Sequence, residues 1–161
     1  MYDRILVPTD GASETKRVVD HAAELAEIHD AELHAVYVVN TSTFAGLPME
    51  TSWEDVSVVL REEGESALEE VVTAAEPYDV TAQTAIVEGP PSKEIVRYAE
   101  RRGCDLVVMG THGRDGLDRL LLGSVAERVV RGCSVPVLTV SVGDEDDQPA
   151  VDAPGEARGR S

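Results

Sequence analysis

The sequence predicts an α/β protein with an open five-stranded parallel sheet and helices on both faces. Five segments with strand character, at residues 2–8, 33–39, 81–87, 105–109 and 136–142, alternate with segments of helical periodicity. Two of them contain the unbroken apolar runs Ile5-Leu6-Val7 and Leu106-Val107-Val108, which are typical of strands buried on both faces. With 161 residues, the chain is long enough for one domain with its own core.

The helical segments are indicated by apolar residues spaced three and four positions apart. The first follows Gly11 and would bury Val18, Val19, Ala22, Ala23 and Ala26. A second helix is predicted at residues 54–75, where Gly64 should weaken it by roughly 1 kcal/mol relative to Ala. The third, at 92–102, begins beside a proline and stops at Gly103. The fourth runs from Ser124 to Gly132.

Two segments fall outside this alternation. Residues 40–53 are polar and rich in turn formers, so they form either a mobile lid or an ordinary surface loop. Residues 143–161 lack periodicity and hold six of the 31 acidic residues but two of the 14 basic ones. We therefore expect a folded domain at residues 1–142 and a disordered acidic tail at 143–161.

The formal net charge of −17 excludes some classes of partner. Nucleic acid and anionic membranes both require a basic surface, so neither is an expected partner. Acidic excess with only two lysines, Lys16 and Lys93, is typical of a halophilic protein working in concentrated salt, although it also suits any very soluble acidic protein.

Cys104 and Cys133 show no metal-ligand spacing and should be buried, reduced thiols. Neither a signal peptide nor a run of 18 apolar residues is present, which predicts a cytoplasmic protein.

Glycines after the fourth strand indicate a phosphate-binding loop. Gly110 and Gly113 are followed, after nine further residues, by Gly123-Ser124 at the start of a helix. Glycine lets backbone N–H groups approach a ligand closely, and a helix N-terminus attracts anions. The Ser124 hydroxyl could either cap its own helix or bind a phosphate oxygen. Because no GxxxxGK[ST] motif occurs, backbone dipoles, Mg²⁺ or Arg114 would have to balance the phosphate charge, and Arg114 could equally be solvated.

These residues carry a resemblance to a known family. The segments RILVPTDGASET, EGPPSKEIVRYAERRGCDLVVMG and MGTHGRDGLDRLLLGSVAERVVRGCSVPVLTV resemble the universal stress protein family over about residues 2–142. The spacing of Gly110, Gly113, Gly123 and Ser124 matches the G-x2-G-x9-G-[ST] motif of its ATP-binding branch. The resemblance implies a Rossmann-like sheet, and a homodimer formed through the strand at residues 136–142.

The resemblance also implies a set of ligand contacts. Pro8, Thr9 and Asp10 would lie beside the nucleotide, and the backbone of Val38 would contact adenine. The phosphates would be held by Gly110, Thr111, His112, Gly113, Arg114, Gly123, Ser124 and Val125. Asp10 could also neighbour Mg²⁺, or instead cap the first helix. His112 is expected to be exposed or near phosphate rather than a general base, because no partnered nucleophile is evident.

The function that the resemblance implies is ATP binding, with AMP or ADP as alternatives, by a regulatory switch of the stress response. A slow ATP hydrolase is one alternative, although the sequence shows no convincing base or holder for the attacking water. A dimerisation module that recruits partners without nucleotide is another, and the intact glycine motif counts against it. Asn40 departs from the family pattern, since some relatives carry an acidic residue there.

Overall fold

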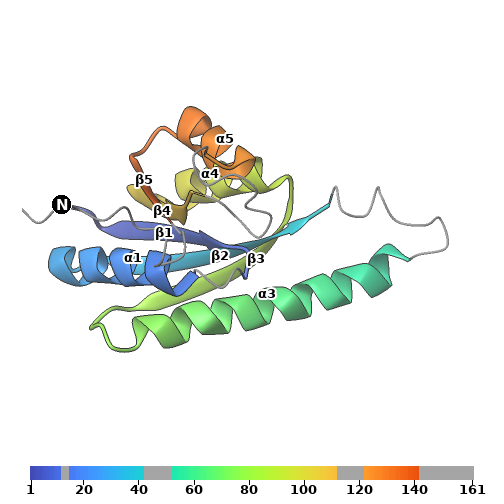
Figure 1. Cartoon of the computed structure of the whole chain (residues 1–161), viewed down its shortest axis with the longest axis horizontal. Coiled ribbons are helices and arrows are strands. Elements are labelled where there is room, and N and C mark those ends of the chain that lie inside the picture. Colours follow the sequence, from blue (N-terminus) through green and yellow to red (C-terminus); the bar gives the residue numbers. More distant parts are fainter. Residues whose placement is uncertain (12–14, 42–51, 112–121, 142–161) are drawn as a thin grey trace, which may run out of the picture.

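The computed structural model describes residues 1–11, 15–41, 52–111 and 122–141. Within them, strands and helices alternate along the chain (Figure 1). The strands are β1 (Arg4–Thr9), β2 (Glu32–Asn40), β3 (Ala82–Gly89), β4 (Leu106–Gly110) and β5 (Val137–Val140). The helices are α1 (Thr15–His29), α3 (Trp53–Ala75), α4 (Pro91–Arg102) and α5 (Ser124–Gly132).

The five strands form one parallel sheet in the order β3-β2-β1-β4-β5, which confirms the predicted architecture. Some strand ends differ from the prediction. β3 continues two residues beyond Val87 because its pairing with β2 extends to Gly89 opposite Asn40. β5 covers only residues 137–140, as an edge strand whose pairing with β4 ends at Val140.

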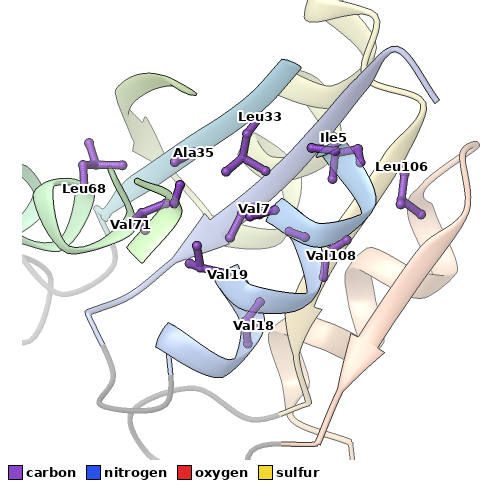
Figure 2. Close-up of a cluster of buried hydrophobic side chains, with 14 of the residues drawn as sticks. Ile5, Val7, Val18, Val19, Leu33, Ala35, Leu68, Val71, Leu106 and Val108 are labelled. Atoms are coloured by element: carbon purple, nitrogen blue, oxygen red, sulfur yellow. The ribbon is translucent and has the colours of Figure 1, made fainter. Parts of the chain in front are cut away.

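Helices cover both faces of the sheet. Figure 1 shows α1 and α3 on one face and α4 and α5 on the other. Alternate residues of β1 serve the two cores: Ile5 and Val7 pack with α1 and α3, whereas Leu6 packs with α4 and α5. Figure 2 shows the first of these cores, where side chains from α1 and α3 meet the central strands. Burial on both faces explains the unbroken apolar runs in β1 and β4.

Gly64 has a packing role that its helix propensity does not reveal. A Cβ atom at this position would lie 2.6 Å from Cδ1 of Tyr37, closer than carbon atoms can approach. Tyr37 belongs to β2 and is only 8% exposed. The missing side chain therefore lets α3 lie directly against the Tyr37 ring, and the cost in helix propensity is offset by this close approach.

Helix ends follow the sequence signals in part. Pro91 occupies the first turn of α4, and Gly103 ends the helix with a left-handed φ of 65°.

Within the described part of the chain, no helix combines the length and apolar character that crossing a bilayer requires.

The amino edge of the sheet holds a buried polar group, His34, which is 3% exposed. Its Nδ1 lies 3.1 Å from the Tyr98 hydroxyl, and its Nε2 lies 3.3 Å from Glu32 Oε2. A neutral imidazole protonated on Nε2 satisfies both contacts, because it donates to Glu32 and accepts from Tyr98. Arg4 Nε also pairs with Glu32 Oε2, at 3.3 Å.

The contact with His34, followed by that with Arg4, holds the pKa of the Glu32 carboxyl below its ordinary value of 4.5. A lowered folded-state pKa stabilises the fold above about pH 4.5 and loses that contribution as the pH falls through the folded value. We expect the difference in urea midpoint between wild type and Glu32→Gln to shrink as the pH falls below about 4.5. An equal gap throughout the acid range would contradict this account.

Candidate functional site

The strand order reverses between β1 and β4, and this point defines the candidate site. From β1 the chain moves outward to β2 and β3, then returns to add β4 and β5 on the other side. In open parallel sheets, ligands bind beyond the carboxyl ends of the strands at such a switch. Pro8, Thr9 and Asp10 lie at the end of β1, and Gly110 and Thr111 lie at the end of β4. The structure therefore brings together two segments that the sequence separates by about a hundred residues.

The turn after β1 is held by local hydrogen bonds. The Gly11 amide donates to Thr9 Oγ1 at 3.2 Å, and the same oxygen lies 3.4 Å from Thr15 Oγ1 at the start of α1. Thr9 is buried, whereas Asp10 is exposed at the edge. Gly11 has a φ of +79°, a left-handed conformation that favours glycine. This turn presents the Asp10 side chain to solvent at the sheet edge.

We expect Gly11→Ala to lower the free energy of unfolding by roughly 1–2 kcal/mol, because the backbone must stay left-handed. The added Cβ itself fits, since it would lie 3.6 Å from Ala67 Cβ. Gly132→Ala is the matched control, with a similar Cβ clearance of 3.8 Å to Val96 but no positive φ. It should be neutral or stabilising by up to about 1 kcal/mol. Equal destabilisation of both variants, measured in urea, would disprove the conformational explanation.

The two ends of the glycine motif are joined by backbone hydrogen bonds. The Thr111 amide donates to Val140 O at 3.0 Å, which extends the β4–β5 ladder by one bond. The Gly123 amide then donates to Thr111 O at 2.7 Å. These two bonds place the start of α5 directly beside the end of β4. His112, Gly113 and Arg114 belong to the motif but lie outside the described residues.

The N-terminus of α5 opens at this edge. Gly123 is its N-cap residue, and the first bond within the helix runs from Glu127 N to Gly123 O at 2.9 Å. The amides of Ser124, Val125 and Ala126 therefore precede the first helical hydrogen bond and belong to the part of the helix that attracts anions. Of these three residues, Ala126 was not predicted as a site residue, because the exposure of its amide at the helix N-terminus depends on the residue at which α5 begins.

Ser124 does not cap α5. It is exposed and is the first residue of the helix proper, and Gly123 takes the capping position without a side-chain hydrogen bond. One of the two roles predicted for the Ser124 hydroxyl is therefore wrong, because capping requires the residue one position earlier.

The end of β2 lies next to this site. Thr9 pairs in register with Tyr37, so Val38 follows one residue beyond that pair on the neighbouring strand. The half-buried Val38 packs on the side of the sheet covered by α4 and α5. Asn40 ends the strand opposite Gly89. The structure thus places Val38 at the same edge as Thr9 and Thr111, consistent with a single site.

Other reactive groups lie away from this edge. The thiol of Cys104 is buried, and burial raises its pKa to about 11, so it stays protonated at neutral pH. Cys133 is half-buried rather than buried as predicted, and both cysteines are free. They line a hollow of about 300 Å³ at the C-terminal ends of α4 and α5.

Among the residues that the structure describes, no three His, Cys, Asp or Glu side chains gather as a metal site.

The fold is therefore that of an open parallel α/β protein, with the N-terminus of α5 at the edge where the strand order reverses. The model of the universal stress protein family matches residues 1–141. Universal stress protein MJ0531 of Methanocaldococcus jannaschii is 49% identical over 140 residues, covering 87% of this chain and 82% of that protein. The chain belongs to the universal stress protein family.

Solved structures agree with this assignment. Protein MJ0577, also from M. jannaschii, matches with a TM-score of 0.79 and 30% identity, covering 89% of this chain and 99% of that one. A universal stress protein solved in complex with cAMP matches with a TM-score of 0.68 and 27% identity, covering 88% of this chain and 99% of that one. Within this family, a solved relative therefore binds an adenine nucleotide.

Proposed function

We propose that this protein binds ATP at the edge formed by β1, β4 and α5, and that occupancy of this site acts as a switch in the stress response. The observation that carries the proposal is the Gly123 N to Thr111 O hydrogen bond of 2.7 Å, which brings both ends of the glycine motif to one place. A phosphate there would face the N-terminus of α5 and the end of β4.

The chemistry of this edge suits a nucleotide rather than a free phosphate. The amides of Ser124, Val125 and Ala126 would donate to phosphate oxygens, whereas the Gly123 amide is already bonded to Thr111. Pro8, Thr9 and Val38 line the neighbouring strand ends, where a base and ribose would lie. The solved relative in complex with cAMP supports an adenine nucleotide.

Charge balance is the main demand on such a site, since the chain carries −17 overall. Mg²⁺ is commonly held by phosphate oxygens together with one or two carboxylates, and Asp10 is an exposed carboxylate at this edge. Arg114 would add a positive charge from the part of the motif outside the described residues. We therefore propose that Mg²⁺ enters with ATP rather than being held by the protein alone.

Isothermal titration with ATP, ADP and AMP tests this function, with and without Mg²⁺, at low and at molar salt. We expect saturable binding of ATP that is strengthened by Mg²⁺. Mass spectrometry of nucleotide released from freshly purified protein identifies the ligand held in the cell. No heat with any adenine nucleotide, combined with no co-purifying nucleotide, would overturn the proposal and favour a partner-recruiting module.

We also propose that the protein is a homodimer formed through β5. Among the described strands, β5 pairs with β4 on one side, and it carries Leu138, which is 39% exposed. Val130 on α5 is also exposed, at 44%. An open edge with apolar side chains beside it is a common place for a second copy to pair.

Leu138→Asp should weaken this dimer by at least about tenfold, because two carboxylates would meet in the symmetric interface. Light scattering after gel filtration, over a range of concentrations, measures the change. Val58→Asp is the control, because Val58 on α3 is equally apolar and 55% exposed. A monomeric wild type, or an equal effect of both variants, would contradict assembly through β5.

A further inference from the structure

The two helical layers of this protein carry opposite net charge. α1 and α3 together hold three basic and ten acidic residues, for a net charge of −7. α4 and α5 hold six basic and three acidic residues, for a net charge of +3. Because the whole chain has a net charge of −17, a basic helical layer is not expected from composition alone. It marks a surface suited to an acidic partner.

The basic side chains of this layer are at the surface. All six are exposed, and we call five of them, Lys93, Arg97, Arg101, Arg128 and Arg131, the basic face; the sixth, Arg102, lies over the Tyr98 ring. Lys93, Arg97 and Arg101 are four residues apart, so they form one stripe along α4. Arg97 pairs with Glu94 and Arg131 pairs with Glu127, each at 2.8 Å. Lys93, Arg101 and Arg128 form no ion pair with any residue that the structure describes.

The two helices of the basic face lie side by side. A Cβ on Gly132 of α5 would be 3.8 Å from Val96 of α4. Both helices pack on the same core, through Ile95 and Ala99 of α4 and Val129 of α5. Figure 1 shows them together on the face of the sheet opposite α1 and α3. The positive charges of both helices therefore belong to one surface.

We propose that the basic face binds the acidic segment Asp144-Glu145-Asp146-Asp147 of the same chain. This segment carries four consecutive acidic residues and begins four residues after Val140, the end of β5. Val140 lies at the edge where α5 begins, because Thr111 N donates to Val140 O and Gly123 N donates to Thr111 O. The chain thus leaves β5 at the side of the sheet from which α5 starts.

The length of chain is sufficient for this contact. Residues 142–147 span at most about 20 Å when extended. β5 and β3 are at opposite edges of the sheet, roughly 19 Å apart over four strand spacings, and α4 begins two residues after β3. The extended segment together with the long Lys93 side chain can therefore span the distance to the first turn of α4. Attachment to β5 also gives the segment an effective concentration in the millimolar range, which favours weak ionic contacts within one chain. Concentrated salt would screen them, so the contact should be strongest at low ionic strength.

A zero-length carbodiimide cross-link tests the proposal on the full chain, because the sequence contains only two lysines. Lys16 lies 2.8 Å from Asp20 on α1 and provides an internal reference for the reaction. At low salt we expect peptide mass spectrometry to find Lys93 linked to residues 144–147. An equal mixture of ¹⁴N- and ¹⁵N-labelled protein distinguishes links within one chain from links between chains, and only the former are expected.

A pair of matched variants tests the role of charge. Arg128→Glu reverses one charge of the basic face and should lower the fraction of Lys93 that is linked to residues 144–147 by about threefold or more. Arg17→Glu makes the same change at an exposed position on α1, in the opposite layer, and should leave the yield unchanged.

Three results would overturn the proposal. The first is a Lys16–Asp20 link without any link from Lys93 to the acidic segment. The second is a Lys93 link to that segment only between differently labelled chains, or a link to α3 of a second copy, which would assign the basic face to assembly. The third is an equal loss of yield in Arg128→Glu and Arg17→Glu.

Discussion

Replacing Ser124 with proline is expected to weaken ATP binding by about 10–100-fold while leaving the fold intact, because one charge-assisted hydrogen bond contributes about 1.5–3 kcal/mol. Proline has no amide hydrogen, so the substitution removes one proposed phosphate donor from the N-terminus of α5. The first position of a helix tolerates proline, whose fixed φ suits that position. α4 already begins in this way, with Pro91 in its first turn.

The local backbone also accepts this change. A residue before proline must be extended, and Gly123 has a φ of −62° and a ψ of 156°. Ser124→Ala is the control, because it removes the hydroxyl but keeps the amide. We expect it to lose much less affinity than Ser124→Pro in isothermal titration, with urea midpoints close to wild type for both. Equal affinities for Ser124→Pro and wild type would contradict the proposed donors, and equal losses in both variants would assign the contact to the hydroxyl.

Gly64→Val is expected to lower the free energy of unfolding by about 2–3 kcal/mol. The Cβ alone would lie 2.6 Å from Tyr37 Cδ1 and 3.0 Å from its Cγ, before the two methyl groups are added. Because Tyr37 is 8% exposed and lies on β2 within the core, its ring can move aside only by disturbing the packing of α3 on the sheet. The effect is therefore one of overpacking, and it opposes the gain in helix propensity.

Ser66→Val on the same helix separates these effects. Ser66 is exposed, so valine there changes helix propensity without meeting the core. Urea unfolding should show a small change for Ser66→Val, a large fall in midpoint for Gly64→Val, and a similar slope for both. If the two variants are equally stable, the close approach of α3 to Tyr37 does not limit this position.

The elements that the sequence predicts well are those whose signal is local. The apolar runs at Ile5-Leu6-Val7 and Leu106-Val107-Val108 identify β1 and β4, because both faces of these strands are buried. Gly103 marks the end of α4 because its left-handed φ of 65° favours glycine. The end of β3 was less predictable: the predicted strand stops at Val87, but pairing with β2 as far as Asn40 carries it to Gly89.

The parts of the site that the sequence could not predict depend on contacts between distant segments. The glycine spacing located the end of β4 and the start of α5, but it did not show that the Gly123 amide bonds to Thr111. Because that bond occupies the Gly123 amide, the proposed phosphate donors are the amides of Ser124, Val125 and Ala126. In the same way, the sequence indicates only that Gly64 weakens its helix, whereas the structure shows that α3 packs directly against Tyr37 at this position. Neither fact follows from helix or strand periodicity, because each depends on which elements become neighbours.

The most direct test of the nucleotide site is the change in backbone amide chemical shifts on adding ATP, measured by NMR on ¹⁵N-labelled protein and compared with adenosine. We expect the amides of Ser124, Val125 and Ala126 to shift with ATP but much less with adenosine, because only ATP brings phosphate to the N-terminus of α5. Amides near Thr9 and Val38 should respond to both ligands. Shifts that are confined to other parts of the protein, such as the hollow beside Cys133, or that are equal for ATP and adenosine at α5, would contradict a phosphate site at this helix.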